Sequence, residues 1–307
     1  MDPMKPQDGP LAGQVALVAG GTRGATKAIA VELGRAGAVV HVTGRTARGV
    51  PSPMGRPETV EDTAEEIEAL GGTARAHRVD HSDVTAVAAL VDDVAARHDG
   101  RLDILVNGIW GGDPLADWEH PFWEQPVEVG LRLLAQALHT HIITSVAAAP
   151  LLVANGRGLV LELTDGKAGD PYRGALYYDL AKDSVTRLAL AMAGDLRPHH
   201  VAAVALTPGF LRSEAMLDRF GVTEESWRDG ISRDPLFAVS ESPVLVARAA
   251  VALATDPDVM RLSGASLASW DLARDYDLTD ADGSRPDWGR FYADWAAGRD
   301  PDPSDYR

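Results

Sequence analysis

Tyr178 and Lys182 are the two residues in this sequence whose types and spacing point most clearly to chemistry. In a helix, side chains four positions apart lie on the same face, so the phenol and the ammonium would be neighbours. A nearby cation favours the ionised form of a phenol, and we therefore expect the pKa of Tyr178 to fall towards the working pH. The pair predicts a site at which Tyr178 moves a proton.

A glycine-rich turn begins at Gly20 and ends at Gly24, far upstream of this pair and between a predicted strand and a predicted helix. Glycine permits a tight turn and a close approach of the backbone, and the following helix offers free N–H groups to phosphate. Thr26 stands where a third glycine would be expected. The turn predicts a dinucleotide site whose contacts are Gly20, Thr22, Arg23, Gly24 and Ala25.

The residue type at the end of the second predicted strand bears on the choice of dinucleotide. A site for NAD usually places Asp or Glu there to bind the ribose 2′-hydroxyl, whereas this sequence has Arg45, with Arg23 in the glycine-rich turn. Both guanidinium groups could hold a 2′-phosphate, although a single arginine is more often a solvated surface residue. Two arginines at these places favour NADP (NADPH) as the cofactor.

Composition excludes several classes of function. The 307 residues carry a formal net charge of −16, so a nucleic acid is not expected as a partner. There is no cysteine, which excludes thiolate metal sites and cysteine nucleophiles. His139 and His141 do not face each other on a helix, and we expect no metal site. The N-terminus has no apolar signal core, which indicates a cytoplasmic protein.

Short apolar, β-branched runs alternate with helical patterns along the chain. We expect strands at residues 14–19, 38–43, 74–79, 102–106, 159–163, 201–206 and 265–268, and helices at residues 25–36, 58–70, 84–97, 127–152, 176–196 and 243–254. This alternation predicts the α/β class, with a single doubly wound, Rossmann-type parallel sheet and helices on both faces. Residues 133–156 lack charged side chains, but polar residues interrupt them, so a buried or interface helix is expected there and not a membrane span.

The predicted domain covers residues 13–272, after a flexible N-terminal arm at residues 1–12 and before an acidic C-terminal extension at residues 273–307. The extension either packs across the body or reaches a neighbouring subunit. Residues 46–57 are rich in proline, glycine and arginine and predict a loop or flap. Residues 208–240 predict a substrate loop.

The ordered set Gly20-x3-Gly24, Asp80, Asn107, Tyr178-x3-Lys182 and Pro208-Gly209 resembles the classical short-chain dehydrogenase/reductases over about residues 13–270. The resemblance implies that Tyr178 is the general acid/base and that Lys182 lowers its pKa and holds the nicotinamide ribose. It also implies a homodimer or homotetramer built on the long apolar helix and the helix at 176–196. The C-terminal part resembles one branch of this family, whose substrates are poorly defined. The further cofactor contacts that the resemblance implies are Asp80, Asn107, Pro208, Gly209, Leu211 and Ser213.

Two catalytic positions depart from the family pattern. Asp165 stands where a serine normally donates a hydrogen bond to the substrate oxygen, and the helix asparagine that relays protons is Ala135 or Gln136. An ionised Asp165 could only accept hydrogen bonds and would oppose ionisation of Tyr178, whereas a protonated one could donate. A carboxylate would also suit a cationic substrate, and Thr164 could supply the missing hydroxyl. Asp165 could equally cap a turn in an inactive site.

The sequence therefore predicts an NADP-dependent oxidoreductase acting on a small molecule, at a carbonyl, alcohol or imine carbon. One alternative is a non-redox lyase, isomerase or cyclase that uses Tyr178 and Asp165 as an acid/base pair. Another is a cofactor-binding protein without turnover. The substrate pocket should lie at the carboxyl ends of the strands, with candidate apolar walls at Trp110, Phe122, Trp123, Phe210 and Met216.

Overall fold

A parallel sheet of seven strands forms the centre of the protein, in the order β3-β2-β1-β4-β5-β6-β7. The structure is a computed structural model that describes residues 8–50 and 52–307. The order reverses direction between β1 and β4, as in a doubly wound sheet, and the predicted fold class is confirmed. The strands are β1 (Val15–Ala19), β2 (Val39–Gly44), β3 (Thr73–Arg78), β4 (Ile104–Asn107), β5 (Gly158–Leu163), β6 (Val201–Thr207) and β7 (Ser266–Ala268).

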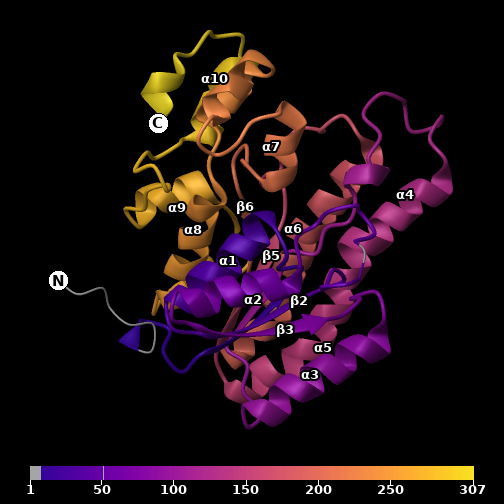
Figure 1. The fold of residues 1–307 in the computed structure, drawn as a ribbon, viewed down its shortest axis with the longest axis vertical. Helices are drawn as coiled ribbons and strands as arrows, with labels where there is room; N and C mark the ends of the chain where they lie inside the picture. The colour runs from indigo at the N-terminus through magenta and orange to yellow at the C-terminus, as the bar shows by residue number, and fades with distance from the viewer. Residues whose placement is uncertain (1–7, 51) are drawn as a thin grey trace.

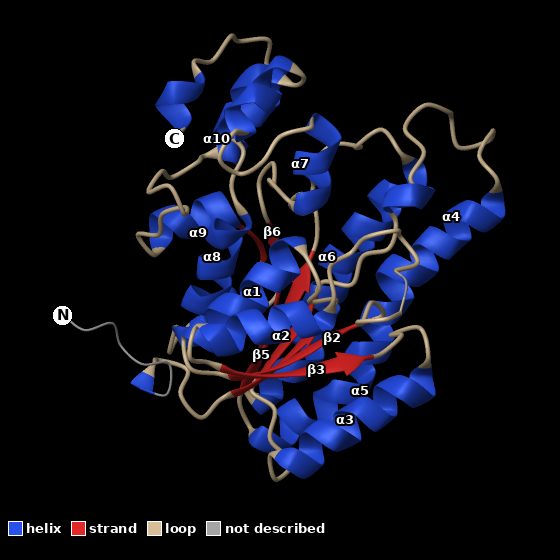
Figure 2. Cartoon of the chain, in the orientation of Figure 1, coloured by secondary structure: helices blue, strands red, loops and turns tan. Residues whose placement is uncertain are grey.

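Helices cover both faces of the sheet (Figure 1 and Figure 2). One apolar cluster joins the sheet to α1, α2 and α8, and a second joins it to α3, α5 and α6. The helices are α1 (Gly24–Arg35), α2 (Val60–Ala69), α3 (Val84–Arg97), α4 (Val127–Leu134), α5 (Thr140–Asn155), α6 (Leu176–Leu196), α7 (Glu214–Phe220), α8 (Pro243–Thr255), α9 (Ser269–Asp275) and α10 (Trp288–Ala296), with short 3-10 turns at Asp113–Leu115, Arg197–His199, Trp227–Ser232, Pro235–Val239, Val259–Leu262 and Pro303–Tyr306.

The central strands are apolar because both of their faces are covered. Every residue of β1 and of β6 is buried, which is the pattern expected of parallel strands between two helical layers. The edge strand β3 instead leaves most of its residues partly or fully exposed. The carboxyl ends of the strands all lie at one edge of the sheet, and α7 with the long connecting loops gathers there (Figure 2).

The long apolar helix is interrupted by a π-helical segment, Ala135–His139, between α4 and α5. The run Val127–Asn155 is long and apolar enough to cross a membrane by length and composition alone. However, α5 packs on the sheet through residues such as Ala148 and Leu152, as expected for a helix of the protein body. Part of the run stays exposed, including Val127, Leu131 and Val146.

The two ends of the described chain pack against the body. Leu11, near the end of the predicted arm, is fully buried and its amide donates to the Ala36 carbonyl. Residues 1–7 of the arm lie outside the described part of the chain. In the C-terminal extension, Phe291 and Tyr306 pack against Val239. Of the two alternatives for the extension, packing across the body is therefore the one observed.

Candidate active site

One cavity of about 530 Å³ opens at the carboxyl ends of the strands. It extends from the turn between β1 and α1 to the start of α6, so the predicted phosphate turn and the Tyr178/Lys182 pair line the same space. Sequence positions more than 150 residues apart meet here because parallel strands end at the same edge. The predicted site residues on the lining are Gly20, Thr22, Arg23, Gly24, Ala25, Arg45, Asp80, Trp110, Thr164, Asp165, Tyr178, Lys182, Pro208, Gly209, Phe210, Leu211, Ser213 and Met216.

The turn between β1 and α1 has the geometry that a dinucleotide requires. Gly20 has a φ of +85°, and a Cβ there would lie 2.9 Å from the backbone of Gly108 and Ile109. The N-terminus of α1 has no side-chain cap. Its first amide, at Gly24, donates to the Glu214 carboxylate at 2.8 Å. This helix end already holds an anionic oxygen, so the residues present fit a phosphate group.

Arg23 and Arg45 both line the cavity. Arg45 contacts the Gln136 amide oxygen at 3.5 Å, and Arg23 lies 3.6 Å from the Asp113 carboxylate. The Arg23 guanidinium also contacts the Met54 sulfur. Neither arginine is therefore a solvated surface residue, and each could reach a phosphate in the cavity.

The loop at residues 46–57 borders the cavity through Ser52, Pro53 and Met54. Arg56 joins this loop to α7, because its guanidinium pairs with Asp218 at 2.5 Å. The same guanidinium also pairs with Glu58. The two segments that flank the cavity mouth are thus connected by an ion pair.

Asp80 lines the cavity at the end of β3. Partial burial opposes ionisation of its carboxyl, but hydrogen bonds from Ser82 outweigh burial and lower the pKa of Asp80. The carboxylate is therefore ionised and available to an amine or hydroxyl donor.

Asn107 is not on the lining, which corrects its prediction as a cofactor contact. It is fully buried because its amide nitrogen donates to the Ser145 hydroxyl and to the Glu162 carboxylate, at 2.8 and 2.7 Å. Glu162 in turn faces one ring nitrogen of His141, and the other ring nitrogen faces the Ile109 carbonyl. Asn107 thus belongs to a buried network that supports the backbone bordering the cavity.

Tyr178 donates its phenolic hydrogen to the Asp165 carboxylate at 2.6 Å. Burial, followed by the charge of Asp165 and this hydrogen bond, raises the pKa of Tyr178 well above its usual value. The pKa of Tyr178 therefore does not fall as predicted, because burial and the Asp165 anion both disfavour the phenolate. Tyr178 is protonated at neutral pH in this arrangement.

Lys182 lies over the Trp110 ring, with its ammonium 3.8 Å from the ring centroid and 5.4 Å from that of Tyr178. Burial lowers the pKa of Lys182, and the nearby charges of Asp165 and Asp113 offset this only in part. The ammonium is held by an aromatic face, and Lys182 lines the cavity, where a hydroxyl of a bound ligand could reach it.

The two remaining catalytic candidates differ in what their side chains reach. The Thr164 hydroxyl donates to the Lys182 carbonyl at 2.7 Å, so its proton is engaged and it does not replace the missing serine as a donor. Gln136, in the π-helical segment, lines the cavity, whereas Ala135 does not. Of the two residues aligned with the family's relay asparagine, Gln136 is the one that reaches the site.

Three of the five predicted apolar walls line the cavity, namely Trp110, Phe210 and Met216. Phe122 and Trp123 do not, and that prediction is corrected. They lie before α4, stack edge to face on each other, and are 53% and 71% exposed. Their aromatic character indicated a pocket wall, but their loop carries them away from the strand ends.

Trp288, at the start of α10, is a lining residue that the sequence did not assign to the pocket. Its indole packs on Phe210 with ring centroids 5.5 Å apart and lies against Gly209, where a Cβ would come within 2.7 Å. No local pattern marks Trp288, since it is brought in from the C-terminal extension. Other unassigned lining residues include Thr26, Met54, Ile109, Asp113 and Leu236.

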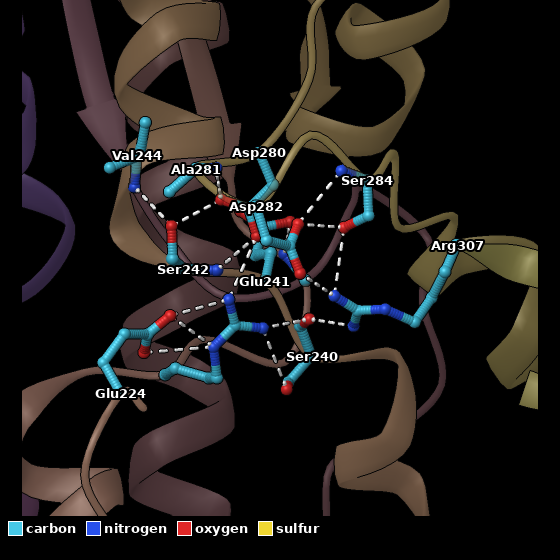
Figure 3. Close-up of polar contacts among 12 residues, drawn as sticks. Glu224, Ser240, Glu241, Ser242, Val244, Asp280, Ala281, Asp282, Ser284 and Arg307 are labelled. Carbon is cyan, nitrogen blue, oxygen red and sulfur yellow. Dashed lines mark hydrogen bonds and ion pairs between the residues drawn. The ribbon is translucent and has the colours of Figure 1, made fainter. Parts of the chain in front are cut away.

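A buried polar network fixes the extension beside the substrate loop (Figure 3). Arg212, fully buried, pairs with Asp280 at 3.2 Å. The Asp280 carboxylate also accepts a hydrogen bond from the Ser242 amide. Arg307 donates to the Ser240 carbonyl and to the Asp282 carboxylate. Because each buried charge needs its partner, the network forms only when the substrate loop at residues 208–240 and the C-terminal extension are packed against each other.

Glu241, next to this network, supports the backbone of the cavity from behind. Its carboxyl accepts hydrogen bonds from the Gly209 amide and the Ser269 hydroxyl. Burial raises the pKa of Glu241 to about 8, so the group is largely protonated at neutral pH. It therefore holds Gly209 in place without bringing a full charge to the site.

Comparisons with known proteins were made with this geometry in view. The sequence model described as "short chain dehydrogenase" matches residues 14–221. Dehydrogenase/reductase SDR family member 1 of Mus musculus is 36% identical to the chain over 278 residues, which are 89% of this chain and 85% of the mouse protein.

Two solved structures are similar over most of the chain. A metagenomic short-chain oxidoreductase in complex with NADP is 27% identical, with a TM-score of 0.63, and the match covers 81% of this chain and 94% of that one. A 7α-hydroxysteroid dehydrogenase complexed with NADH and 7-oxo glycochenodeoxycholic acid is 26% identical, with a TM-score of 0.68, and the match covers 89% and 95% of the two chains. Similar structures thus hold either nicotinamide cofactor.

Proposed function

The chain belongs to the short-chain dehydrogenase family, as its ordered motifs predicted, and on that premise we propose that it is an NADP-dependent oxidoreductase acting on a small molecule. When bound, the nicotinamide supplies or accepts the hydride that is exchanged with a carbonyl, alcohol or imine carbon. The observation that carries the proposal is the single cavity that joins the phosphate turn to Tyr178 and Lys182.

The preference for NADP rests on the charges around the first two strands. Arg23 and Arg45 line the cavity, and β2 ends at Gly44 and is followed by Arg45, not by the acid that would bind a ribose 2′-hydroxyl. A guanidinium binds phosphate in a bidentate, charge-assisted manner. These two side chains would hold the 2′-phosphate, and the amides at the start of α1 would hold the pyrophosphate.

In this proposal Tyr178 holds or moves a proton at the substrate, and Lys182 binds the nicotinamide ribose. The raised pKa of Tyr178 keeps its hydroxyl protonated, as an acid for the reductive direction must be. Asp165 orients that hydroxyl through the hydrogen bond at 2.6 Å. The lining by Trp110, Phe210 and Trp288 would exclude water from the reacting carbon.

The contact between Tyr178 and Asp165 also favours a second candidate function. A hydroxyl and a carboxylate in direct contact form an acid/base pair that could serve a lyase, isomerase or cyclase without redox chemistry. Such an enzyme would need no hydride donor. Binding without any turnover is the third possibility that the experiments below separate.

We also propose a homodimer or homotetramer and a cytoplasmic location. Support for the oligomer comes from the apolar side chains that remain exposed on the two helices that build interfaces in this family. These are Val127, Leu131, Ile142 and Val146 on the long helix, and Leu180 and Leu190 on α6. Size-exclusion chromatography with light scattering tests the oligomer, and fractionation of the native host tests the location.

Calorimetric titration of NADP(H) and NAD(H) into the purified protein tests the proposed function. We expect NADPH to bind at least 10-fold more tightly than NADH. A screen of carbonyl compounds and imines then follows NADPH consumption, with Tyr178→Phe as the variant that removes the proton donor. If neither cofactor binds, the oxidoreductase is excluded, and unchanged turnover of carbonyl compounds in Tyr178→Phe would exclude Tyr178 as acid/base.

A further inference from the structure

The Asp165 carboxylate lines the cavity and forms no salt bridge within the described residues, although the charge of the Lys182 ammonium acts on it from a longer distance. Among the described residues, no lysine or arginine nitrogen lies within 4.0 Å of it, and its one side-chain hydrogen bond comes from Tyr178. The nearest basic groups are engaged elsewhere: Arg173 pairs with Asp179 at 2.7 Å, and Lys182 lies over Trp110. A partly exposed carboxylate in such a position can attract a cation from a ligand.

A neutral carbonyl substrate would meet unfavourable chemistry at this point. A carboxylate has no hydrogen to donate, and the Tyr178 hydrogen already points to Asp165. Both oxygens would therefore present lone pairs to the carbonyl oxygen. Reduction would then build negative charge on that oxygen beside an existing anion, which raises the barrier.

A substrate nitrogen that carries a positive charge would meet the opposite situation. The iminium forms an ion pair with Asp165 whether or not its nitrogen carries a hydrogen, and the ion pair persists up to the transition state. Addition of hydride to carbon removes the positive charge, so no proton donor is required during that step. The iminium is also more electrophilic at carbon than the neutral imine.

We propose that the site takes substrates whose reacting carbon is double-bonded to a cationic nitrogen, with Asp165 as the residue that binds this nitrogen and sets the preference over ketones. The inference rests on the proposed hydride-transfer function and names its substrate class. In the step, a C–H bond forms with the hydride as the C=N π electrons become the nitrogen lone pair, with oxidation of NADPH to NADP⁺. The amine product then takes a proton from solvent, and the reverse direction oxidises the neutral amine.

The surroundings of Asp165 suit a cationic, mainly apolar molecule. The lining near the site is aromatic and apolar, with Trp110, Phe210, Met216 and Trp288. Trp110 already holds the Lys182 ammonium at 3.8 Å, so an aromatic face of this site tolerates a cation. Asp113, on the same lining, adds a second negative charge, although Arg23 lies 3.6 Å from it.

Matched pairs of substrates and two variants test the proposal. The bicyclic pair is 2-methyl-3,4-dihydroisoquinolinium and 1-tetralone, and the small pair is 1-methyl-1-pyrrolinium and cyclopentanone. We expect kcat/KM with NADPH to be at least 100-fold higher for the iminium in at least one pair. In Asp165→Ser, which restores a hydroxyl, this ratio should fall at least 100-fold, mainly because the ketone reacts faster.

Binding gives a readout that does not depend on turnover. The unreactive cation 2,2-dimethyl-1,2,3,4-tetrahydroisoquinolinium should bind to the wild type, with and without NADP⁺, and at least 10-fold more weakly to Asp165→Asn. Both variants should keep the wild-type affinity for NADPH within about threefold, which checks that they fold. Comparing the affinity for the cation with the affinity for NADPH separates loss of the Asp165 charge from loss of the folded site.

Faster reduction of the ketone in both pairs by the wild type would overturn the proposal, as would equal binding of the cation by wild type and Asp165→Asn. Either result, obtained with normal NADPH binding, leaves the proposed oxidoreductase intact. Failure to bind NADPH refutes the proposed function instead, and the titration of the unreactive cation then still decides whether Asp165 binds a positive charge.

Discussion

Replacement of Glu214 by glutamine should tighten the binding of NADPH. The Glu214 carboxylate accepts a hydrogen bond from the Gly24 amide at 2.8 Å, at the helix end where we propose that the pyrophosphate binds. Two unit charges about 4 Å apart at an effective dielectric constant of about 20 repel each other by about 4 kcal/mol. The carboxylate must therefore leave when the phosphate arrives.

The size of the effect follows from the hydrogen bond that is lost. A bond to a charged group contributes about 1.5–3 kcal/mol, and a bond to a neutral amide about 0.5–1.5 kcal/mol. Glutamine keeps the shape of the side chain, and breaking its hydrogen bond with the Gly24 amide costs about 1–2 kcal/mol less than breaking that of Glu214. The dissociation constant for NADPH should therefore fall about 5- to 30-fold.

Calorimetry on wild type and Glu214→Gln measures this difference directly. The control is Glu225→Gln, which removes the same charge from an exposed residue near α7 and should change the affinity less than twofold. Circular dichroism checks that α7 remains folded. Equal or weaker NADPH binding in Glu214→Gln, with the control unchanged, would refute competition between this carboxylate and the phosphate.

Three further predictions concern separate parts of the molecule. Arg45→Ala should weaken NADPH binding by about 2 kcal/mol and NADH binding hardly at all, because only NADPH has the 2′-phosphate; equal losses for both would contradict the assignment. Burial, followed by the charges of His77 and His98, lowers the pKa of His41 to about 3, so His41 is protonated at a lower pH in the folded state than in the unfolded state. The free energy of unfolding should thus fall as the pH drops from about 6.5 towards 3, by up to about 1.4 kcal/mol per pH unit for this group. Thermal melts of His41→Gln should show a weaker dependence of stability on pH over this range, and an unchanged dependence would contradict the assignment. Trp288→Ala should extend turnover to bulkier substrates at a stability cost of about 1–3 kcal/mol, and an unchanged size limit in a substrate series would show that Trp288 is not a wall.

The fold could be predicted from the sequence because its elements carry local signals. The buried strands β1 and β6 are apolar runs, and α6 begins and ends at the predicted residues, Leu176 and Leu196. The alternation of strands and helices then leaves few topologies. The phosphate turn could be predicted for the same reason, since its strand, its glycines and its helix follow one another directly in the sequence.

The electrostatics of the site could not be predicted in the same way. The i,i+4 spacing correctly placed Lys182 on the same helix as Tyr178, but the pKa of Tyr178 depends on Asp165, which another loop brings within 2.6 Å. The family resemblance also implied that Asn107 is a cofactor contact, whereas its side chain faces the buried Glu162. Spacing along one element predicts neighbours, but it does not show which side chains of other elements face them.

The residues at the cavity mouth were the least predictable. Phe122 and Trp123 have the composition of a pocket wall but lie on the surface, and Trp288 completes the wall from the C-terminal extension. Aromatic residues in irregular segments carry no periodicity from which their direction could be inferred. Only the packed structure distinguishes them.

The buried pair of Arg212 and Asp280 also has a consequence for the order of events during synthesis. The two residues are 68 positions apart, and until Asp280 is available the only carboxylate partner of Arg212 among the described residues is the half-exposed Glu224. At about 5–20 residues per second, the ribosome needs roughly 3–14 s to add that length of chain. During this interval β1 to β6 can already pair, while the segment after β6 waits with its arginine in water. A nascent chain paused before Asp280 should therefore be cut by protease within residues 208–240 and resist cleavage in the sheet.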